Sequence, residues 1–525
     1  MKTMRLKKLL LVLMTLFVSM TAGAVDVPFS VWDAANTTLY FTYGEAPAEG
    51  DSWTPEGGSA ITVTDVRTGA NCIDKHYFNN GSVINNCTKA VFESSFASVK
   101  PTNLSGWFNG FSKMITIEGI ENLNTSEATD MSEMFNGCTK LATLDVSHFN
   151  TSKVTSMNGM FANCSVVVLD LSGFDTSNVT MMSHMFYQSR VDVLDLSSFD
   201  TSNVTMMSQM FYRCQGLQYL DLSSFNTSKV TTTSSMFYFC DKLERIVVSD
   251  AWDMSAVTSS TNMFYNCTAL VGEDGTTFDD EAAKDVTKAH AGTGGYLTSN
   301  SLYDDAATTA KYNVLAAAGV STFKLSGRTI KGGKWNTLCI PSNIEDLSAS
   351  TLAGAKVKKL KEYTNDGTSV TITFEDATSI EAGKPYLVKP TADITDPVFD
   401  FAGVAAGSTT VTGAEFIGLY TTKTLTAPNK KQLFLQDDKF YYPGTSDATL
   451  NAFRAYFLVT ADVPEAAASR GIEIDLDGDG ISTGIDFIEN KATGEVKVIY
   501  DLSGHRVANP TKGLYIVNGK KVVIK

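Results

Sequence analysis

One hydrophobic pattern recurs through the middle of the chain. The tetrapeptide Leu-Asp-Leu-Ser, or its variant Leu-Asp-Val-Ser, begins at residues 144, 169, 194 and 220, so the step is 25 or 26 residues. A Met-Phe pair keeps the same rhythm and begins at residues 134, 160, 185, 210, 236 and 263. Self-similarity at a fixed step of this length is typical of repeat proteins. We expect the repeats to occupy residues 91–272.

Each repeat contains two apolar stretches. The Leu-x-x-Leu-x-Leu stretch alternates as a β-strand does, with every second side chain facing inward. A second stretch, exemplified by Val154, Met157, Met160 and Phe161, has helical spacing and predicts a short helix or 3₁₀ turn. One repeat cannot bury both stretches alone, so neighbours must stack. The pattern therefore predicts a solenoid of about seven turns.

The period changes on either side of the repeats. Residues 25–90 include an aromatic alternation from Thr38 to Tyr43, which predicts a β-rich cap over the open end of the repeats. Residues 273–325 are rich in Gly, Ala, Thr and Asp, which is typical of a last turn running into a linker. From residue 326 to 475 many short runs alternate with period two, which predicts a β-sandwich.

The end of the chain predicts a linker and a hairpin. Residues 476–492 form an acidic linker, and residues 493–525 place two apolar runs around Asn518-Gly519, a strong hairpin-turn signal. The predicted fold class is mainly β with short helices. It consists of a leucine-rich-repeat solenoid, a β-sandwich and a small C-terminal β-hairpin tail.

The first 24 residues predict export. A basic start is followed by an apolar run, Leu9 to Met20, that is too short to span a bilayer comfortably. Ala22-Gly23-Ala24 then matches a signal-peptide cleavage site. We expect residues 1–24 to be removed near Ala24, which leaves a secreted or cell-surface, outer-membrane-associated chain with no transmembrane segment.

The charge balance excludes two classes of partner. The formal net charge is −15, and cleavage after Ala24 would remove four basic residues and no acid, leaving −19. Such a surface repels nucleic-acid phosphates and anionic lipid head groups. We therefore expect neither nucleic-acid binding nor direct membrane binding.

Two sets of polar residues recur at fixed places on the predicted strand and are candidate ligand-binding residues. The first set is an acidic ladder of Asp145, Asp170, Asp195 and Asp221. It could form a ligand-facing or cation-binding stripe, or each carboxylate could accept hydrogen bonds from its own turn. The second set varies along one register and would decide the partner; it comprises His148, Gly173, Ser198 and Ser224.

Cysteine also recurs with the repeat. Five cysteines lie three residues after the repeat Phe, and Ser189 holds that place in the remaining repeat: Cys138, Cys164, Cys214, Cys240 and Cys267. A position filled by Cys or Ser predicts a small buried residue, with disulfides between adjacent repeats as the alternative. The spacing lacks a Cys-x-x-Cys or His partner, which argues against zinc. Cys72 and Cys87 could pair, and Cys339 is expected to be a buried thiol.

One acidic segment resembles the start of a calcium loop. Asp475, Asp477 and Asp479 occupy the first, third and fifth positions, Gly480 the sixth and Asp486 the twelfth. No helix is predicted before it, so a plain acidic linker is the alternative. Calcium is the one cofactor that the sequence suggests.

Catalytic motifs are not found. The chain has no His-Glu-x-x-His, no Gly-x-Ser-x-Gly and no phosphate-binding loop, and its five histidines are scattered. We expect a protein that is not an enzyme.

The repeat consensus resembles a known family. The pattern Leu-Asp-Leu-Ser-x-Phe-Asp/Asn-Thr-Ser-x-Val-Thr-x-Met-Ser-x-Met-Phe is similar to that of BspA-like leucine-rich-repeat surface proteins. This resemblance implies an adhesin that binds host matrix proteins or other bacterial surface proteins. The segment from Tyr500 to Lys525 resembles the sorting tail of type IX secretion substrates, which implies display at the cell surface.

Two other functions remain open. Aromatic residues of the predicted sandwich could stack on sugars, which would make the protein a glycan-binding surface protein. A purely structural role in a surface layer is the third alternative.

Overall fold

The computed structural model describes most of the chain. The described residues are 26–69, 72, 81–282, 284–303, 308–366, 370–436, 438–444, 446–463, 473–475, 499–500, 513–517 and 520–524. These residues are mainly β with a few short helices, which confirms the predicted fold class at that level. The predicted signal peptide lies outside them.

The chain divides into two units. The first comprises residues 1–329, 341–343 and 395–404, and the second comprises residues 330–340, 344–394 and 405–525. The sequence had placed one boundary at residue 326, and it could not show that two short later segments belong with the first unit.

The first unit begins with a five-stranded sheet that leads into the repeats. Its strand order is β5-β1-β2-β6-β7. The strands are β1 (Val27–Asp33), β2 (Thr38–Gly44), β5 (Asp65–Thr68), β6 (Lys89–Phe92) and β7 (Thr116–Glu118). β2 pairs antiparallel with β1 but parallel with β6, so the sheet changes direction where the repeats start. Phe41 stacks on Phe92 at 4.6 Å and on Trp107 at 5.6 Å between ring centroids, which closes the apolar interior.

Short elements accompany this sheet. They are β3 (Ser52–Trp53), β4 (Ile61–Thr62), α3 (Gly81–Ile84), η1 (Ser94–Ser98) and η2 (Ile120–Asn122).

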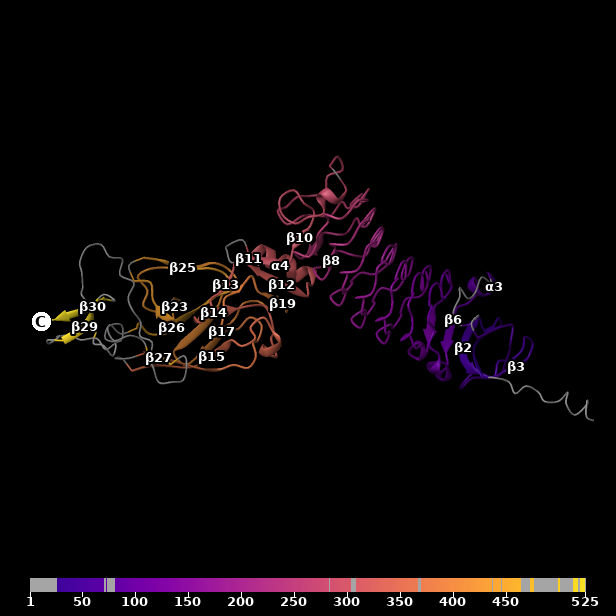
Figure 1. Ribbon diagram of the computed structural model, residues 1–525, viewed down its shortest axis with the longest axis horizontal. Helices are drawn as coiled ribbons and strands as arrows, with labels where there is room; N and C mark the ends of the chain where they lie inside the picture. The colour runs from indigo at the N-terminus through magenta and orange to yellow at the C-terminus, as the bar shows by residue number, and fades with distance from the viewer. Residues whose placement is uncertain are drawn as a thin grey trace, which may run out of the picture. The chain divides into compact units, whose positions relative to one another are not determined.

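Successive repeats lie side by side along the first unit (Figure 1). An alternating set of backbone hydrogen bonds joins each repeat to the next. Met182, His184 and Phe186 each donate an N–H to the following repeat, whereas Met185 and Tyr187 donate to the residue three positions back. In the described repeats this stretch forms no continuous helix, but single turns closed by 3₁₀-type hydrogen bonds to the residue three positions back do occur, and the predicted apolar stripe is buried. A helix would need every N–H within the segment, and here every second N–H bonds to the neighbour.

The Leu-x-x-Leu-x-Leu stretch forms regular strands in only part of the repeats. β8 (Tyr219–Leu222) pairs parallel with β9 (Arg245–Val248), and Val168 and Val193 form an isolated parallel bridge. The sequence had predicted a strand in every repeat. The difference follows from the length of the segment between the Cys/Ser position and the following Leu or Ile of each repeat. Neighbouring repeats form strand pairs where this segment has the same length in both. The spacing between these two positions is six residues before β8 and β9, and five residues before Leu169 and Leu194.

An aromatic ladder fills the interior of the repeats. Seven phenylalanines, one per repeat, stack with centroid distances of 5.5 to 5.9 Å. They are Phe108, Phe135, Phe161, Phe186, Phe211, Phe237 and Phe264. All are fully buried, so each repeat contributes one ring to a continuous core that no single repeat could form.

The segment after the repeats has more regular structure than the expected linker. It contains η3 (Val286–Lys288), β10 (Thr298–Ser299), β11 (Ser301–Tyr303), α4 (Thr308–Ala318) and β12 (Thr322–Ser326). β10 pairs with β9, and β12 pairs with β11 and with β19 (Val398–Asp400). Lys311 on α4 forms an ion pair with Glu273. The strands were not predicted because they are only two to five residues long and because β9 and β19, with which β10 and β12 pair, lie far away in sequence.

The second unit contains two five-stranded sheets. The first has the order β14-β17-β15-β16-β27 and the second β20-β21-β26-β23-β24. The first sheet contains β14 (Asn336–Cys339), β15 (Lys356–Asn365), β16 (Val370–Asp376), β17 (Pro385–Lys389) and β27 (Glu473–Asp475). The second contains β20 (Ser408–Val411), β21 (Ala414–Gly418), β23 (Gln432–Gln436), β24 (Lys439–Tyr441) and β26 (Ala455–Val459).

The two sheets share one apolar core. Phe457 and Phe416 of the second sheet stack at 4.2 Å, and Phe374 of the first meets Phe457 edge-on at 5.9 Å. A small sheet of β22 (Lys423–Leu425) and β25 (Ala448–Leu450) adds a second apolar cluster around Phe434. The remaining short elements are β13 (Thr329–Ile330), η4 (Leu347–Ala349) and β18 (Ile394–Thr395).

The last strands pair with one another. β28 (Ile499–Tyr500), β29 (Gly513–Val517) and β30 (Lys520–Ile524) form an antiparallel sheet. Val517 pairs with Lys520, which confirms the predicted two-residue hairpin connection. Across the described residues, no helix is both long enough and apolar enough to cross a membrane.

Candidate functional site

The acidic ladder is held by turns within its own repeats. The Asp145 carboxylate accepts hydrogen bonds from the Ser147 N–H at 3.0 Å and hydroxyl at 2.7 Å, and Asp170 is bound in the same way by Ser172. These hydrogen bonds lower the pKa of both carboxyl groups. The neighbouring Asp145 charge opposes the shift at Asp170 without reversing it. Each carboxylate thus stabilises its own turn.

The other two aspartates of the ladder also accept from their turns. Asp195 accepts from the Ser197 N–H at 3.0 Å, and Asp221 accepts from the Ser223 N–H at 2.9 Å. The second oxygen of Asp221 additionally accepts the Ser321 N–H at 2.9 Å, from the segment just before β12. Asp221 is therefore partly covered, whereas the other three are exposed.

The variable polar residues join one repeat to the previous one. The Ser198 hydroxyl donates to the Leu171 carbonyl at 3.0 Å, and the Ser224 hydroxyl donates to the Leu196 carbonyl at 2.9 Å. His148 Nε2 lies 2.9 Å from the Ile120 carbonyl oxygen. At Gly173 a Cβ would lie 2.8 Å from the Ser147 carbonyl oxygen, so a side chain does not fit. These contacts give all four positions a structural role.

The repeat cysteines are buried free thiols, as predicted. Cys214, Cys240 and Cys267 donate to the phenylalanine carbonyl of the preceding repeat at 2.9 to 3.0 Å. Burial raises the pKa of Cys214 and of Cys267 to about 12. Cys87 and Cys339 are likewise buried free thiols, so the suggested Cys72–Cys87 bridge is not formed.

The possible calcium loop lies almost wholly outside the described residues. Asp475 ends β27, whose backbone pairs with β16, while Asp477, Asp479 and Asp486 are not described. Elsewhere in the described chain, no group of three or more His, Cys, Asp or Glu side chains is placed to hold a metal ion.

A row of tyrosines lies on the surface of four consecutive repeats. We call Tyr187, Tyr212, Tyr238 and Tyr265 the tyrosine row. Their rings are parallel to within 13° and stack at centroid distances of 4.6, 4.8 and 4.8 Å. Each residue directly follows the buried Phe of its repeat, so its side chain points outward where the Phe points inward. Sequence reasoning missed this row, although Met-Phe-Tyr recurs four times in succession.

Arg213 and Phe239 lie beside the row. The Arg213 guanidinium carbon lies 5.7 Å from the Tyr212 ring centroid and 5.0 Å from that of Phe239. Both residues have left-handed backbones, with φ of 53° and 58°. The equivalent positions in other repeats hold Gly137, Asn163, Gln188 and Asn266, and of these residue types Gly and Asn tolerate this conformation better. A bulky aromatic residue in this conformation is strained, and such strain is typical of functional sites.

A hollow of about 530 Å³ opens next to the row. We call it the notch. It is lined by Val167, Gln188, Ser189, Arg190, Asp192, Arg213, Gln215 and Gly216. Gln188 and Arg213 directly follow Tyr187 and Tyr212, so the notch and the tyrosine row form one continuous surface. Val167, which lines the notch, is 39% exposed, and Val168 and Val193, which directly follow the lining residues Val167 and Asp192, are exposed at 76% and 74%.

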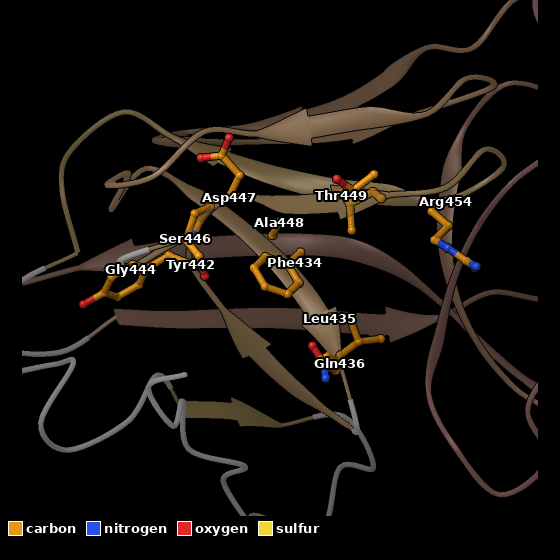
Figure 2. A pocket seen from close by; sticks show the side chains of 12 residues that line it. Phe434, Leu435, Gln436, Tyr442, Gly444, Ser446, Asp447, Ala448, Thr449 and Arg454 are labelled. Carbon is orange, nitrogen blue, oxygen red and sulfur yellow. The ribbon is translucent and has the colours of Figure 1, made fainter. Parts of the chain in front are cut away.

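A second hollow lies in the second unit. It has a volume of about 360 Å³ and lies between β23 and β25 (Figure 2). Phe434 lies in its middle, while Tyr442 and Arg454 lie at opposite ends with their polar groups pointing apart. The polar groups do not converge on one point, as a catalytic site would require.

The comparisons with known proteins bear only on the repeats. The family model described as "Mycoplasma protein of unknown function, DUF285" matches residues 102–192 and 188–296. No curated protein and no solved structure matches the chain. The similarity therefore covers the repeats and carries no stated activity.

Proposed function

We propose that the protein is an exported, non-enzymatic binding protein of the cell surface. In this proposal the repeats form a leucine-rich-repeat solenoid that carries the ligand surface, and the two five-stranded sheets of the second unit form a β-sandwich. The stacked phenylalanine ladder and the hydrogen bonds between repeats support a rigid extended element. The apolar run and cleavage pattern of residues 1–24 support export.

The tyrosine row with Arg213 is the observation that carries the proposal. Tyr and Arg are enriched among the residues that dominate protein–protein binding, because each combines a large contact area with directional polar groups. Here five such residues lie together on one rigid surface. By contrast, the hydroxyls of Ser198 and Ser224 are used between repeats. The partner that fits best is a protein, either of the host matrix or of another bacterial surface, as the family resemblance implies.

A binding screen tests this proposal. Residues 25–525 are passed over immobilised fibronectin, fibrinogen, collagen and mucin, and over a glycan array. We expect saturable binding to at least one protein, weakened tenfold or more by the double change Tyr212→Ala and Tyr238→Ala. Asp170→Asn, on the acidic ladder, is the control and should bind as the parent does. Absence of binding to every protein offered, including extracts of bacterial surfaces, would overturn the proposal.

The hollow of the second unit supports glycan binding as the second candidate. Tyr442 is half-buried and offers aromatic surface, whereas Phe434 is only 6% exposed; Asp447 and Arg454 offer polar groups at the rim. If this reading holds, the glycan array gives the signal and Tyr442→Ala removes it, while the tyrosine-row variants leave it unchanged.

A further inference from the structure

We propose that the notch and the tyrosine row together bind an acidic segment of a partner protein. The partner's carboxylates would bind Arg190 and Arg213, and its apolar side chains would lie on the exposed valines. This inference rests on the proposed binding function and names the chemistry of its ligand.

The notch exists because two adjacent repeats are one residue short. Leu169 lies five positions after Cys164 and Leu194 lies five positions after Ser189, whereas the corresponding step is six positions in the repeats on either side. The missing residue leaves a gap at the surface while the interior ladder continues through Phe161 and Phe186 at 5.9 Å. At the far wall, a Cβ on Gly216 would lie 2.6 Å from the Val191 carbonyl oxygen, so only glycine allows this close approach.

The charge around the notch is opposite in sign to that of the chain. Arg190 and Arg213 are exposed and line the notch, and Asp192 is its single acidic residue. Lys140 and Lys242 are exposed at the positions that correspond to Gly216 in their own repeats, and Asp241 lies beside Lys242. Cations therefore outnumber acids along this edge of a chain with net charge −15. Such a patch selects a negatively charged partner.

The tyrosine row adds hydrogen-bond donors and a matching electrostatic field. The rings cover one another's faces, so they present mainly edges and hydroxyls to solvent, and aromatic edges carry partial positive charge. The Tyr187 hydroxyl accepts a hydrogen bond from Gln188 at 3.2 Å. Within the described part of the chain the other three hydroxyls have no hydrogen-bond partner, so they are available to carboxylates.

A polypeptide fits better than a sulfated polysaccharide. Val167 lines the notch, and the exposed Val168 and Val193 are bridged to each other directly after the lining residues Val167 and Asp192; a heavily sulfated chain would leave these apolar side chains uncovered. Asp192 would also repel a uniform polyanion inside the notch. A protein segment can place aliphatic side chains on the valines and its carboxylates on the guanidinium groups, which bind carboxylates through two parallel hydrogen bonds.

The test uses residues 25–525 and three labelled peptides of five Glu-Val-Gly, Gln-Val-Gly or Lys-Val-Gly repeats, with heparin as a fourth probe. We expect the Glu peptide alone to bind, more weakly as salt is raised. Arg213→Glu and Arg190→Glu should each weaken it tenfold or more. Arg213→Lys, which keeps the charge but loses the planar fork, should fall between. Lys229→Glu is the matched control, because Lys229 is exposed on the same repeats and does not line the notch. This variant should bind the Glu peptide as the parent protein does.

Circular dichroism and thermal midpoints must show that every variant is folded. Equal binding of the Glu and Gln peptides, no binding of the Glu peptide at about 1 mM, or indifference to both Arg reversals would overturn the inference. Binding of heparin in place of the Glu peptide would replace the acidic protein by a sulfated glycan. If matrix-protein binding persists while the peptide result is negative, the inference fails and the proposed function stands.

Discussion

The residue type at a buried position of a repeat is determined by its contacts with the neighbouring repeat. Four of the repeat thiols, Cys138, Cys214, Cys240 and Cys267, donate to the carbonyl of a phenylalanine in the preceding repeat, and Ser189 contacts the Cys214 sulfur at 3.7 Å. The position must be small because it lies beside the stacked rings. This is why its Cys/Ser identity could be interpreted correctly from sequence alone.

Burial makes the thiols unreactive. The thiolate is the reactive form, and the pKa of Cys214 and Cys267 is raised to about 12 because burial disfavours the charge. We expect no labelling of the repeat cysteines by a thiol-specific disulfide reagent at pH 8 in the native protein, and complete labelling in guanidinium chloride. Rapid native labelling would show that the repeats open locally.

Substitution of Phe239 should affect partner binding much more than the free energy of unfolding. Asn occupies the equivalent left-handed position at residues 163 and 266, so Phe239→Asn relieves about 1 kcal/mol of backbone strain. The change also removes ring contacts to Tyr238 and Tyr265 that are worth a similar amount. We expect denaturant unfolding to change by less than about 1 kcal/mol while partner binding falls tenfold or more. A large loss of stability with binding intact would make Phe239 a structural residue.

At the scale of elements, the spacing of the buried Met and Phe residues could be predicted from the sequence, but the backbone conformation of the segment that carries them could not. The inward-facing Met and Phe positions were found from their spacing, which a helix and the observed chain of turns both satisfy. The difference lies in left-handed residues such as His184 and Gln188, for which the side-chain pattern holds no signal. The tyrosine row was missed for the same reason, because a helix in this segment would direct these side chains differently from the observed turns. The length mismatch that removes strands was present in the sequence, but its effect depends on which neighbour each repeat meets.

Turns of the form Asx-x-Ser make the repeats sensitive to acid. Hydrogen bonds from the Ser177 hydroxyl and N–H lower the pKa of Asp175. A lowered folded-state pKa contributes stability that is present above the unfolded value, near pH 4, and is lost as pH falls through the folded pKa. Asp175→Asn copies Asn150 of the preceding repeat, whose side chain accepts the same hydrogen bonds from Ser152. We expect unchanged stability at pH 7 and a shallower loss of stability below pH 4, measured by urea unfolding across pH.

A steeper acid loss in Asp175→Asn than in the parent would contradict this assignment. Asp170→Asn provides a second test, because the Ser172 hydroxyl and N–H lower the pKa of Asp170 in the same way; it should likewise make the loss of stability below pH 4 shallower.

At the scale of the whole molecule, the two units have separate apolar cores. The phenylalanine ladder belongs wholly to the first unit, and the cluster around Phe457 belongs wholly to the second. Large multi-unit chains with separate cores commonly unfold in more than one step. The sequence anticipated two bodies from the change of period near residue 326, but not the return of residues 395–404 to the first.

Core truncations should therefore act on different transitions. Phe186→Ala removes one ring of the ladder and Phe457→Ala removes the centre of the second core, each at a cost of about 3–5 kcal/mol. By differential scanning calorimetry we expect each change to lower one transition and leave the other in place. Equal shifts of a single transition in both variants would show that the units unfold together.

The notch lies where two repeats are one residue shorter than their neighbours. A surface loop that grows by insertion must find new contacts, whereas a repeat that loses one residue between its thiol and its leucine leaves the phenylalanine and cysteine registers of its neighbours intact. Deletion of one residue at this place can therefore open a hollow in a chosen repeat, and insertion of one residue can close it, without disturbing the interior. The repeats can therefore change their binding surface through the length of this exposed segment. The buried phenylalanine and cysteine positions, on which folding depends, stay the same.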